Sequence, residues 1–376
     1  MLRQMNEYAT KAEYGLKKCR KSENNLDFFC VLSDKHYLCT EMQKVGLIGL
    51  NSVQHFLVDG LCICCAFLLA ELYGDRFGAY GDKVSMGAIL IYNVLAFMSQ
   101  PLTGLLADRM THRHWLVLWS SLLLTMAVAC TSLLSVLVKD GYVGMDDAVV
   151  EWLLILVAAL LGVGNSLFHV WGGKQMVVKA GNDMRALGVF VSTGALGLAV
   201  GLVFLSWSLL YALLLAIVVL AVVYVRLDDG SSIEASEVKM LSDWFTPVRI
   251  WTLVVALMLF VCYRAFAGEM FSKGITKTHE MILVIAAVAM LGKMAGGWIA
   301  RYVGIVRSLM ALLAGVALCF LFWNEYDAVL LAGIFLMNCT MSITLYLANV
   351  LLPGREGLAF GLLAAALLPG YLLAVL

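Results

Sequence analysis

The feature that most constrains this chain is a series of long apolar runs. About eleven of them are each long enough to cross the roughly 30 Å hydrocarbon core of a bilayer as a helix. A bilayer core supplies no water to satisfy backbone amides, so these runs are predicted to be membrane-spanning helices. The chain is 62% hydrophobic and 14% charged, unlike a soluble domain. The runs lie near residues 46–73, 86–106, 115–138, 150–172, 186–205, 208–226, 249–268, 280–300, 304–323, 328–350 and 357–376.

Composition and motifs exclude several classes of protein. Lysine and arginine total 26, as do aspartate and glutamate, so no nucleic-acid partner is expected. Most of the ten cysteines lie in apolar runs, and Cys19, Cys30 and Cys39 match no metal-binding spacing, so no metal site is predicted. Neither a phosphate-binding loop nor a nucleophile–base constellation is present. The sequence therefore predicts no catalytic residues, no cofactor and no enzymatic activity.

Lysine and arginine in the loops predict the orientation, because cytoplasmic loops carry the excess of these residues. One set of alternate loops holds Arg109, Arg113, Lys174, Lys179, Arg185, Arg226, Lys239, Arg249, Arg301, Arg307 and Arg355. The opposite set holds Arg76, Lys83, Lys139, Lys273 and Lys277. The first set is predicted to be cytoplasmic, with the N-terminus inside.

Polar stretches divide the chain into four segments. We predict a polar cytoplasmic N-terminal segment at 1–45, a helix bundle at 46–226, a cytoplasmic linker at 227–248 and a second bundle at 249–376. No apolar region follows a basic start in 1–45, so that segment is not a signal peptide. The eleventh run ends the sequence, so the twelfth helix of a pair of six-helix halves is expected to be missing.

Two motifs repeat between the halves. Gly104-Leu-Leu-Ala-Asp108-Arg109 ends the second run, and Gly297-Trp-Ile-Ala-Arg301 ends the eighth. The glycines around the fifth and eleventh runs also share their spacing; they are Gly181, Gly188 and Gly197, and Gly354, Gly361 and Gly370. Two matches in the same order favour a duplicated architecture, with a substrate site between the halves near the middle of the membrane.

The segment after the second run is a short charged connection to the third. It resembles the hinge between helices 2 and 3 of the major facilitator superfamily of transporters. Gly104 permits close helix packing. Asp108 is placed to pair with Arg109, Arg113 or a neighbouring helix end, and such a cluster can hold one face shut. We favour this gating function over a positively charged loop that only sets the membrane topology. In the second copy of the motif, Gly297 and Arg301 are the corresponding candidates for the gate.

Ionisable residues within the spans are the candidates for the transport pathway, because they are costly in lipid. Asn51, His55 and Asp59 are four residues apart and share one helix face. Asp59 and Arg264 lie at similar heights, so an ion pair between them is plausible, either as a structural tie or as part of a substrate and proton site.

Two further ionisable residues have open interpretations. His169 can change charge near neutral pH, or can be a hydrogen-bonded packing residue. Lys293 can bind an anionic substrate, although we favour extension of its side chain to the cytoplasmic surface.

Four segments together resemble the fosmidomycin-resistance-like branch of the superfamily. They are Gln54–Asp59, the hinge, Gly164–His169 and Arg264–Gly268. The resemblance implies proton-coupled export of a small drug or metabolite, with functions for His55, Asp59, His169 and Arg264. Branch members often have Pro-Glu after the histidine of helix 4, where this chain has Val170-Trp171.

The sequence thus predicts an all-helical membrane protein with the major facilitator fold. We expect a proton-coupled transporter working by alternating access, a monomer in the bilayer of a cell membrane, the cytoplasmic membrane of a bacterium if the resemblance holds. Its partners would be a small-molecule substrate and protons. The alternatives are a gradient-free facilitator of a small organic anion, using Arg264 and Lys293, and a degenerate relative or sensor without transport.

Overall fold

The computed structural model describes residues 27–110, 114–140, 148–228, 246–323 and 326–375, and leaves undescribed the side chains of 27–44 and 148–149. Two compact units are Met1–Gly46 and Leu47–Leu376. The polar segment predicted at 1–45 and most of the linker predicted at 227–248 lie outside the described side chains. The architecture below is that of the second unit.

Every element in the described ranges is a helix, as predicted. The helices are α2 (Asp27–Phe77), α3 (Ala79–Met98), α4 (Gln100–Arg109), α5 (Trp115–Lys139), α6 (Ala148–Ala180), α7 (Met184–Val203), α8 (Trp207–Leu227), α10 (Pro247–Lys273), α11 (His279–Val303), α12 (Ile305–Leu321), α13 (Asp327–Leu351), α14 (Glu356–Ala365) and α15 (Leu367–Val375).

Ten stretches of these helices are long and apolar enough to span a membrane, and the shorter apolar helix α12 corresponds to an eleventh predicted run. Two spans are interrupted. The second span breaks between α3 and α4, where Pro101 occupies the first turn of α4. The last span breaks between α14 and α15, at Ala366, three residues before Pro369. Proline removes one backbone hydrogen bond and clashes with the preceding turn, which explains a break at these points.

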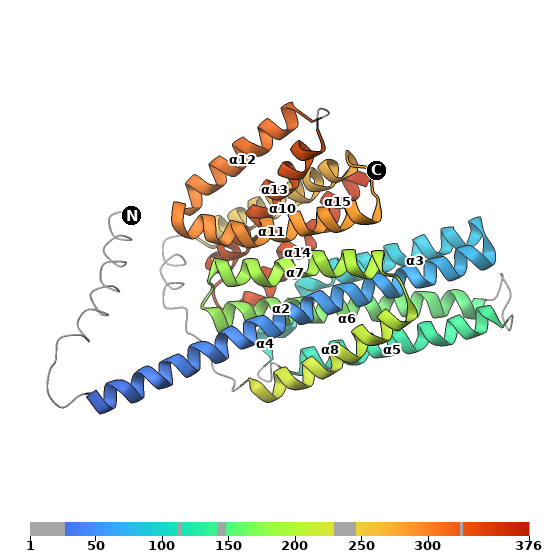
Figure 1. Ribbon diagram of the computed structural model, residues 1–376, viewed down its shortest axis with the longest axis horizontal. Helices are drawn as coiled ribbons and strands as arrows, with labels where there is room; N and C mark the ends of the chain where they lie inside the picture. The colour runs from blue at the N-terminus through green and yellow to red at the C-terminus, as the bar shows by residue number, and fades with distance from the viewer. Residues whose placement is uncertain (1–26, 111–113, 141–147, 229–245, 324–325, 376) are drawn as a thin grey trace. The chain divides into compact units, whose positions relative to one another are not determined.

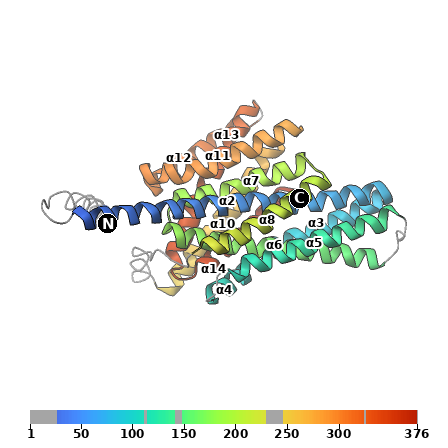
Figure 2. The same ribbon diagram turned by 60° about the horizontal axis from the view of Figure 1, so that its bottom comes forward.

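For description we call α2 to α8, which precede the undescribed residues 229–245, the first group, and α10 to α15, which follow them, the second group (Figures 1 and 2). In the first group α6 packs against α5 and α3, and α5 also packs against α8. In the second, α13 packs against α10, α11 and α12. The groups meet where α7 packs along α11 and α4 packs along α14. The largest apolar core lies mainly in the first group and includes Phe168, Trp171 and Phe190.

The contacts between the groups follow the sequence repeat. In the second span, Gly104 approaches the backbone of Gly357 so closely that an added Cβ would meet the Gly357 carbonyl. In the eighth span, Gly297 meets the carbonyl of Met184 in the same way. The glycine spacing that aligns Gly181 with Gly354 also aligns Met184 with Gly357. The α4–α14 and α7–α11 contacts are therefore equivalent, which supports an internal duplication.

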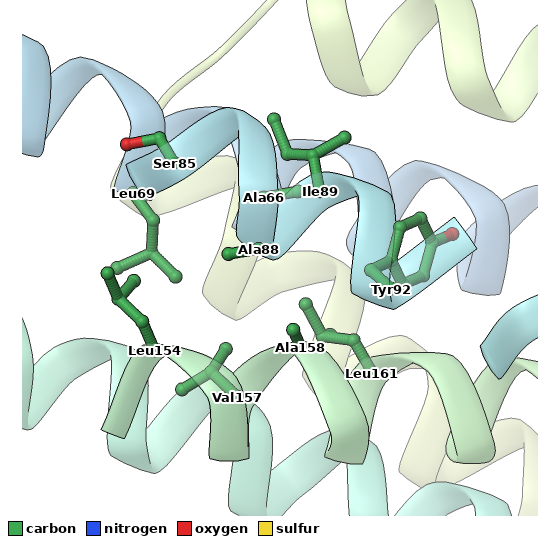
Figure 3. A pocket seen from close by; sticks show the side chains of 10 residues that line it. All are labelled: Ala66, Leu69, Ser85, Ala88, Ile89, Tyr92, Leu154, Val157, Ala158 and Leu161. Atoms are coloured by element: carbon green, nitrogen blue, oxygen red, sulfur yellow. The ribbon is translucent and has the colours of Figure 1, made fainter. Parts of the chain in front are cut away.

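A small cavity lies between α2, α3 and α6 (Figure 3). Its lining is almost entirely aliphatic, and the hydroxyl of Ser85 is already donated to the carbonyl of Gly81. None of the predicted pathway residues lines it. The cavity is thus an apolar packing feature rather than a site for a polar solute. Its lining residues are Ala66, Leu69, Ser85, Ala88, Ile89, Tyr92, Leu154, Val157, Ala158 and Leu161.

Candidate functional site

The most unusual feature inside the first group is a buried cluster of two histidines and an aspartate. His55 and Asp59 lie one turn apart on α2, and His169 comes from α6. The Nε2 atoms of the two histidines are 2.9 Å apart. His55 Nε2 lies 3.3 Å from Asp59 Oδ2, and His169 Nε2 lies 3.3 Å from Asp59 Oδ1. We call His55, Asp59 and His169 the triad.

The other nitrogen of each histidine fixes its tautomer. His55 Nδ1 lies 2.7 Å from the carbonyl oxygen of Phe190, and His169 Nδ1 lies 3.0 Å from that of Asn165. A carbonyl oxygen can only accept, so each Nδ1 carries the hydrogen and donates. In the neutral ring each Nε2 then presents a lone pair. With both rings neutral, two lone pairs and a carboxylate would therefore converge, and a proton or another cation between them would stabilise the arrangement.

Neighbouring groups hold the triad in place. The ring of His55 stacks on Phe190, with ring centroids 4.6 Å apart, and meets the ring of His169 edge-on at the same separation. Asn165 Nδ2 donates to Asp59 Oδ1 at 3.3 Å. On α7, Gly194 faces the triad, and an added Cβ there would lie 2.6 Å from His55 Nε2. The site is thus built from three helices.

The other predicted pathway residues lie apart from the triad or beside it. Asn51, one turn before His55, donates to the carbonyl of Gly172 at 3.1 Å and so ties α2 to α6. Arg264 is buried on α10, and its Nη1 donates to Thr344 Oγ1 at 3.1 Å. Lys293 on α11 is half-buried and lies within electrostatic range of both Asp59 and Arg264.

One sequence interpretation needs correction, and another is left open. The plausible Asp59–Arg264 ion pair is not formed: Asp59 pairs with the two histidines, and Arg264 donates to Thr344. The sequence predicted no metal site; the structure does not test that prediction, but it brings one ligand-type atom from each member of the triad within 4.8 Å of the others. Helical spacing places His55 beside Asp59, but only the packing of α6 on α2 could reveal the third member.

Asp108, at the end of α4, makes the contact that joins the groups. Its carboxylate accepts the backbone N–H groups of Gly357 and Leu358, both at 2.9 Å, in the first turn of α14. Lys174 Nζ donates to Asp108 Oδ1 at 2.9 Å and to the Ala107 carbonyl at 3.0 Å. A carboxylate is favoured at a helix N-terminus, where amides are unpaired and the dipole is positive. We call Asp108, Lys174 and this first turn of α14 the latch.

The sequence prediction that Asp108 pairs with a neighbouring helix end agrees with this contact, while Arg109 is exposed and Arg113 lies outside the described residues. Sequence reasoning missed Lys174 as the partner. Its position beyond the apolar part of the α6 span marked it as a positive loop residue, but nothing in the pattern aimed it at Asp108.

The equivalent contact between α7 and α11 has different charges. Asp183 caps α7 itself, since its Oδ1 accepts the backbone N–H of Arg185 at 2.8 Å. Partial burial would raise the pKa of Asp183, but hydrogen bonds from Arg185 and the nearby charge of Arg301 outweigh it and lower that pKa. Arg301 is exposed at the end of the eighth span, close enough to act on Asp183.

A chain of apolar membrane-length helices with polar groups buried between them defines a multi-pass membrane protein. The sequence matches the Major Facilitator Superfamily over residues 55–375. The chain belongs to this superfamily and is a membrane transporter.

Solved structures of low sequence identity show the same fold. The transporter FucP in its outward conformation shares 12% identity, with a TM-score of 0.60, over 88% of this chain and 91% of that one. A second structure, of the fucose:proton symporter FucP of E. coli, shares 11% identity, with a TM-score of 0.62, over 88% of this chain and 90% of that one. A bacterial homologue of the iron transporter ferroportin, in an outward-facing state, shares 16% identity, with a TM-score of 0.58, over 87% of this chain and 90% of that one. No match is found among curated proteins.

Proposed function

We propose that this chain is a secondary active transporter that exports a small molecule in exchange for protons by alternating access. Residues 46–226 and 249–376 are the two parts that move against each other. The proposal extends the fosmidomycin-resistance-like resemblance, in which the solute is a drug or metabolite. It places a monomer in a cell membrane, with the N-terminus in the cytoplasm.

The observation that carries this proposal is the triad. With both rings neutral, its two Nε2 lone pairs and its carboxylate converge, and a proton between them would convert a repulsive contact into hydrogen bonds. Ionisable groups buried in a span are typical of proton relays. Asp59 and His169 are the proposed proton carriers, and His55 is the neighbour that orients them.

The latch supports alternating access. Asp108 lies in the first group and the amides it accepts lie in the second, so the contact must break when the two parts separate at that end. By the distribution of lysine and arginine, this end faces the cytoplasm. The latch would then stabilise the state that is closed to the cytoplasm and release it once per cycle.

The test is transport by purified protein in proteoliposomes with a pH-sensitive dye inside and a panel of candidate solutes. An active solute should move protons, and a protonophore should abolish its uphill movement. Asp59→Asn keeps the side-chain shape but removes the charge, and should lower proton-coupled flux by at least about tenfold, the loss of one charged hydrogen bond. His279→Gln, at an exposed histidine on α11, is the matched control. Solute movement that is indifferent to the protonophore would contradict proton coupling.

A second candidate is a gradient-free facilitator of a small organic anion. The observation that favours it is Arg264, a buried guanidinium whose described hydrogen bond uses one of its five N–H donors. Lys293 would add a second positive charge from α11. Downhill anion flux that persists in Asp59→Asn and disappears in Arg264→Gln would support this function over proton exchange. A sensor without transport would bind ligand and show no flux in either variant.

A further inference from the structure

The triad has the composition of a transition-metal site. Imidazole nitrogen suits zinc, iron and nickel, and two histidines with one carboxylate are a recurrent ligand set for divalent metals of the first transition row. Two neutral imidazoles and one carboxylate carry a single negative charge, so a divalent ion would leave only one net positive charge buried.

The spacing of the ligand atoms also fits a metal ion. At bond lengths of about 2.0–2.1 Å, two ligands of one ion lie about 2.9 Å apart at a right angle and about 3.3 Å apart at a tetrahedral angle. The triad distances are 2.9 Å between the two Nε2 atoms and 3.3 Å from each Nε2 to its nearer carboxylate oxygen. Each histidine meets a different oxygen of the same carboxylate, and one ligand atom from each of the three residues lies within 4.8 Å of the others, close enough to surround one ion.

The groups behind the ligands are those that metal sites use. A metal-binding histidine usually donates its second ring N–H to a backbone carbonyl or carboxylate, which fixes the tautomer and orients the ring. Both histidines do so, to Phe190 and Asn165. The Asn165 side chain also donates to Asp59 Oδ1, so this residue orients two of the three ligands.

The site is enclosed but reachable. The side chain of His169 is 14% exposed and that of Asp59 is 11% exposed, while His55 is 6% exposed. On the α7 side the backbone of Gly194 packs directly against the triad, where an added Cβ would clash with the Asp59 carboxylate. An ion would thus reach the triad from the side of His169, its most exposed member.

We propose that the triad binds a divalent transition-metal ion, which is a transported solute of this protein. As transport, this rests on the proposed function above; as binding, it stands on the geometry alone. The lone pairs that hold the metal cannot hold a proton at the same time. One ion therefore excludes the other, which is the condition for exchange across a membrane.

Binding is tested first, with the full chain in detergent and Co²⁺ as the probe. One Co²⁺ per chain should bind, with a ligand-field absorption spectrum typical of nitrogen and oxygen ligands. His55→Ala, Asp59→Asn and His169→Ala should each weaken binding more than 100-fold, and Asn165→Ala by about 10–100-fold, as for other supporting residues. His279→Ala should bind as the unchanged protein does. Binding that survives all three triad substitutions would overturn the proposal.

A measurement on the unchanged protein covers the case in which these variants do not fold. X-ray absorption at the zinc edge should show nitrogen or oxygen ligands at about 2.0–2.2 Å with the outer-shell scattering of two imidazole rings. A first shell of sulfur, or of oxygen without imidazole, would overturn the proposal.

Flux separates this proposal from the proposed function. Proteoliposomes with a metal-sensitive dye inside should show Mn²⁺ or Zn²⁺ movement that requires His169, together with proton movement in the opposite direction. Metal binding without any solute flux would contradict the transport function and leave a binding site. Proton-coupled movement of organic solutes without metal binding would overturn the metal site and leave the transport function.

Discussion

The two contacts that join the helix groups occupy equivalent positions in the repeat but use opposite chemistry. Between α4 and α14 the acid lies across the contact: the N-cap Arg355 gives α14 no side-chain hydrogen bond, and Asp108 accepts the unpaired amides instead. Between α7 and α11 the acid lies on the capped helix itself, as Asp183. In this second contact, the residue that corresponds to Asp108 in the repeat is the positively charged Arg301.

The difference shows what a duplicated contact must conserve. Each of the two helix N-termini has one carboxylate at its amides, and each contact pairs a negative group with a positive one. Which side supplies the acid is free to change. Burial differs as well: the side chains of Asp108 and Lys174 are 8% and 13% exposed, whereas those of Asp183 and Arg185 are 31% and 37% exposed. The latch should therefore be the stronger contact.

The largest effect is expected from Asp108→Ala. This change leaves two amides and the partly buried Lys174 ammonium without their carboxylate, at a cost of about 3 kcal/mol. The exchange of the Gly357 and Leu358 amides with deuterium should accelerate by about 100-fold. Exchange at the start of α7 should stay unchanged, because its cap is Asp183. Equal acceleration at both helices would show that the contacts are not independent.

The backbone contacts should respond alike in the two halves. Gly104→Ala and Gly297→Ala each place a methyl group against a carbonyl of the opposite helix, at Gly357 and Met184. Overpacking of this kind costs about 1–3 kcal/mol. Thermal unfolding in lipid nanodiscs should show a similar loss of stability for the two variants. A loss at only one glycine would break the equivalence inferred from the repeat.

A smaller effect is expected from Arg301→Gln. Arg301 is exposed and acts on Asp183 only through its charge, and exposed charge interactions contribute about 0–1 kcal/mol and are screened by salt. The free energy of unfolding should fall by less than about 1 kcal/mol at low salt, and the difference from the unchanged protein should vanish at high salt. The matched change in the latch, Lys174→Gln, should lower the free energy of unfolding by more than Arg301→Gln does, and this loss should depend less on salt.

The smallest effect concerns pH. The pKa of Asp183 is lowered in the folded state from its ordinary value of 3.8. The stability that ionised Asp183 contributes to the fold is therefore complete above pH 3.8 and is lost as the pH falls through the lowered pKa. Because the side chain is a third exposed, the loss should be a few tenths of a kcal/mol. Asp183→Asn should remove this pH dependence from the exchange of the Arg185 amide, after correction for intrinsic rates. A dependence that persists in this variant would point to another group.

Much of the fold could be predicted from the sequence, because apolar length alone fixes membrane helices. All eleven runs correspond to described helices, and the two breaks fall close to prolines. The repeat was visible in glycine spacing, since close helix contacts tolerate little else. Helix periodicity brought His55 and Asp59 together. Contacts between distant helices could not be predicted, so the positions of His169, Lys174 and Arg264 relative to Asp59 or Asp108 required the structure.

The repeat also bears on how many ions move per cycle. Gly197 meets the carbonyl of Phe56, and its equivalent, Gly370, meets that of Cys262. By this alignment, Val261 and Ala265 stand on α10 where His55 and Asp59 stand on α2. The repeat therefore contains two copies of the contact proposed to act as a gate and one copy of the proposed ion ligands. If the triad is the one site for the transported ion, the initial rate of ion transport should follow a simple hyperbola in ion concentration, with a Hill coefficient of about one.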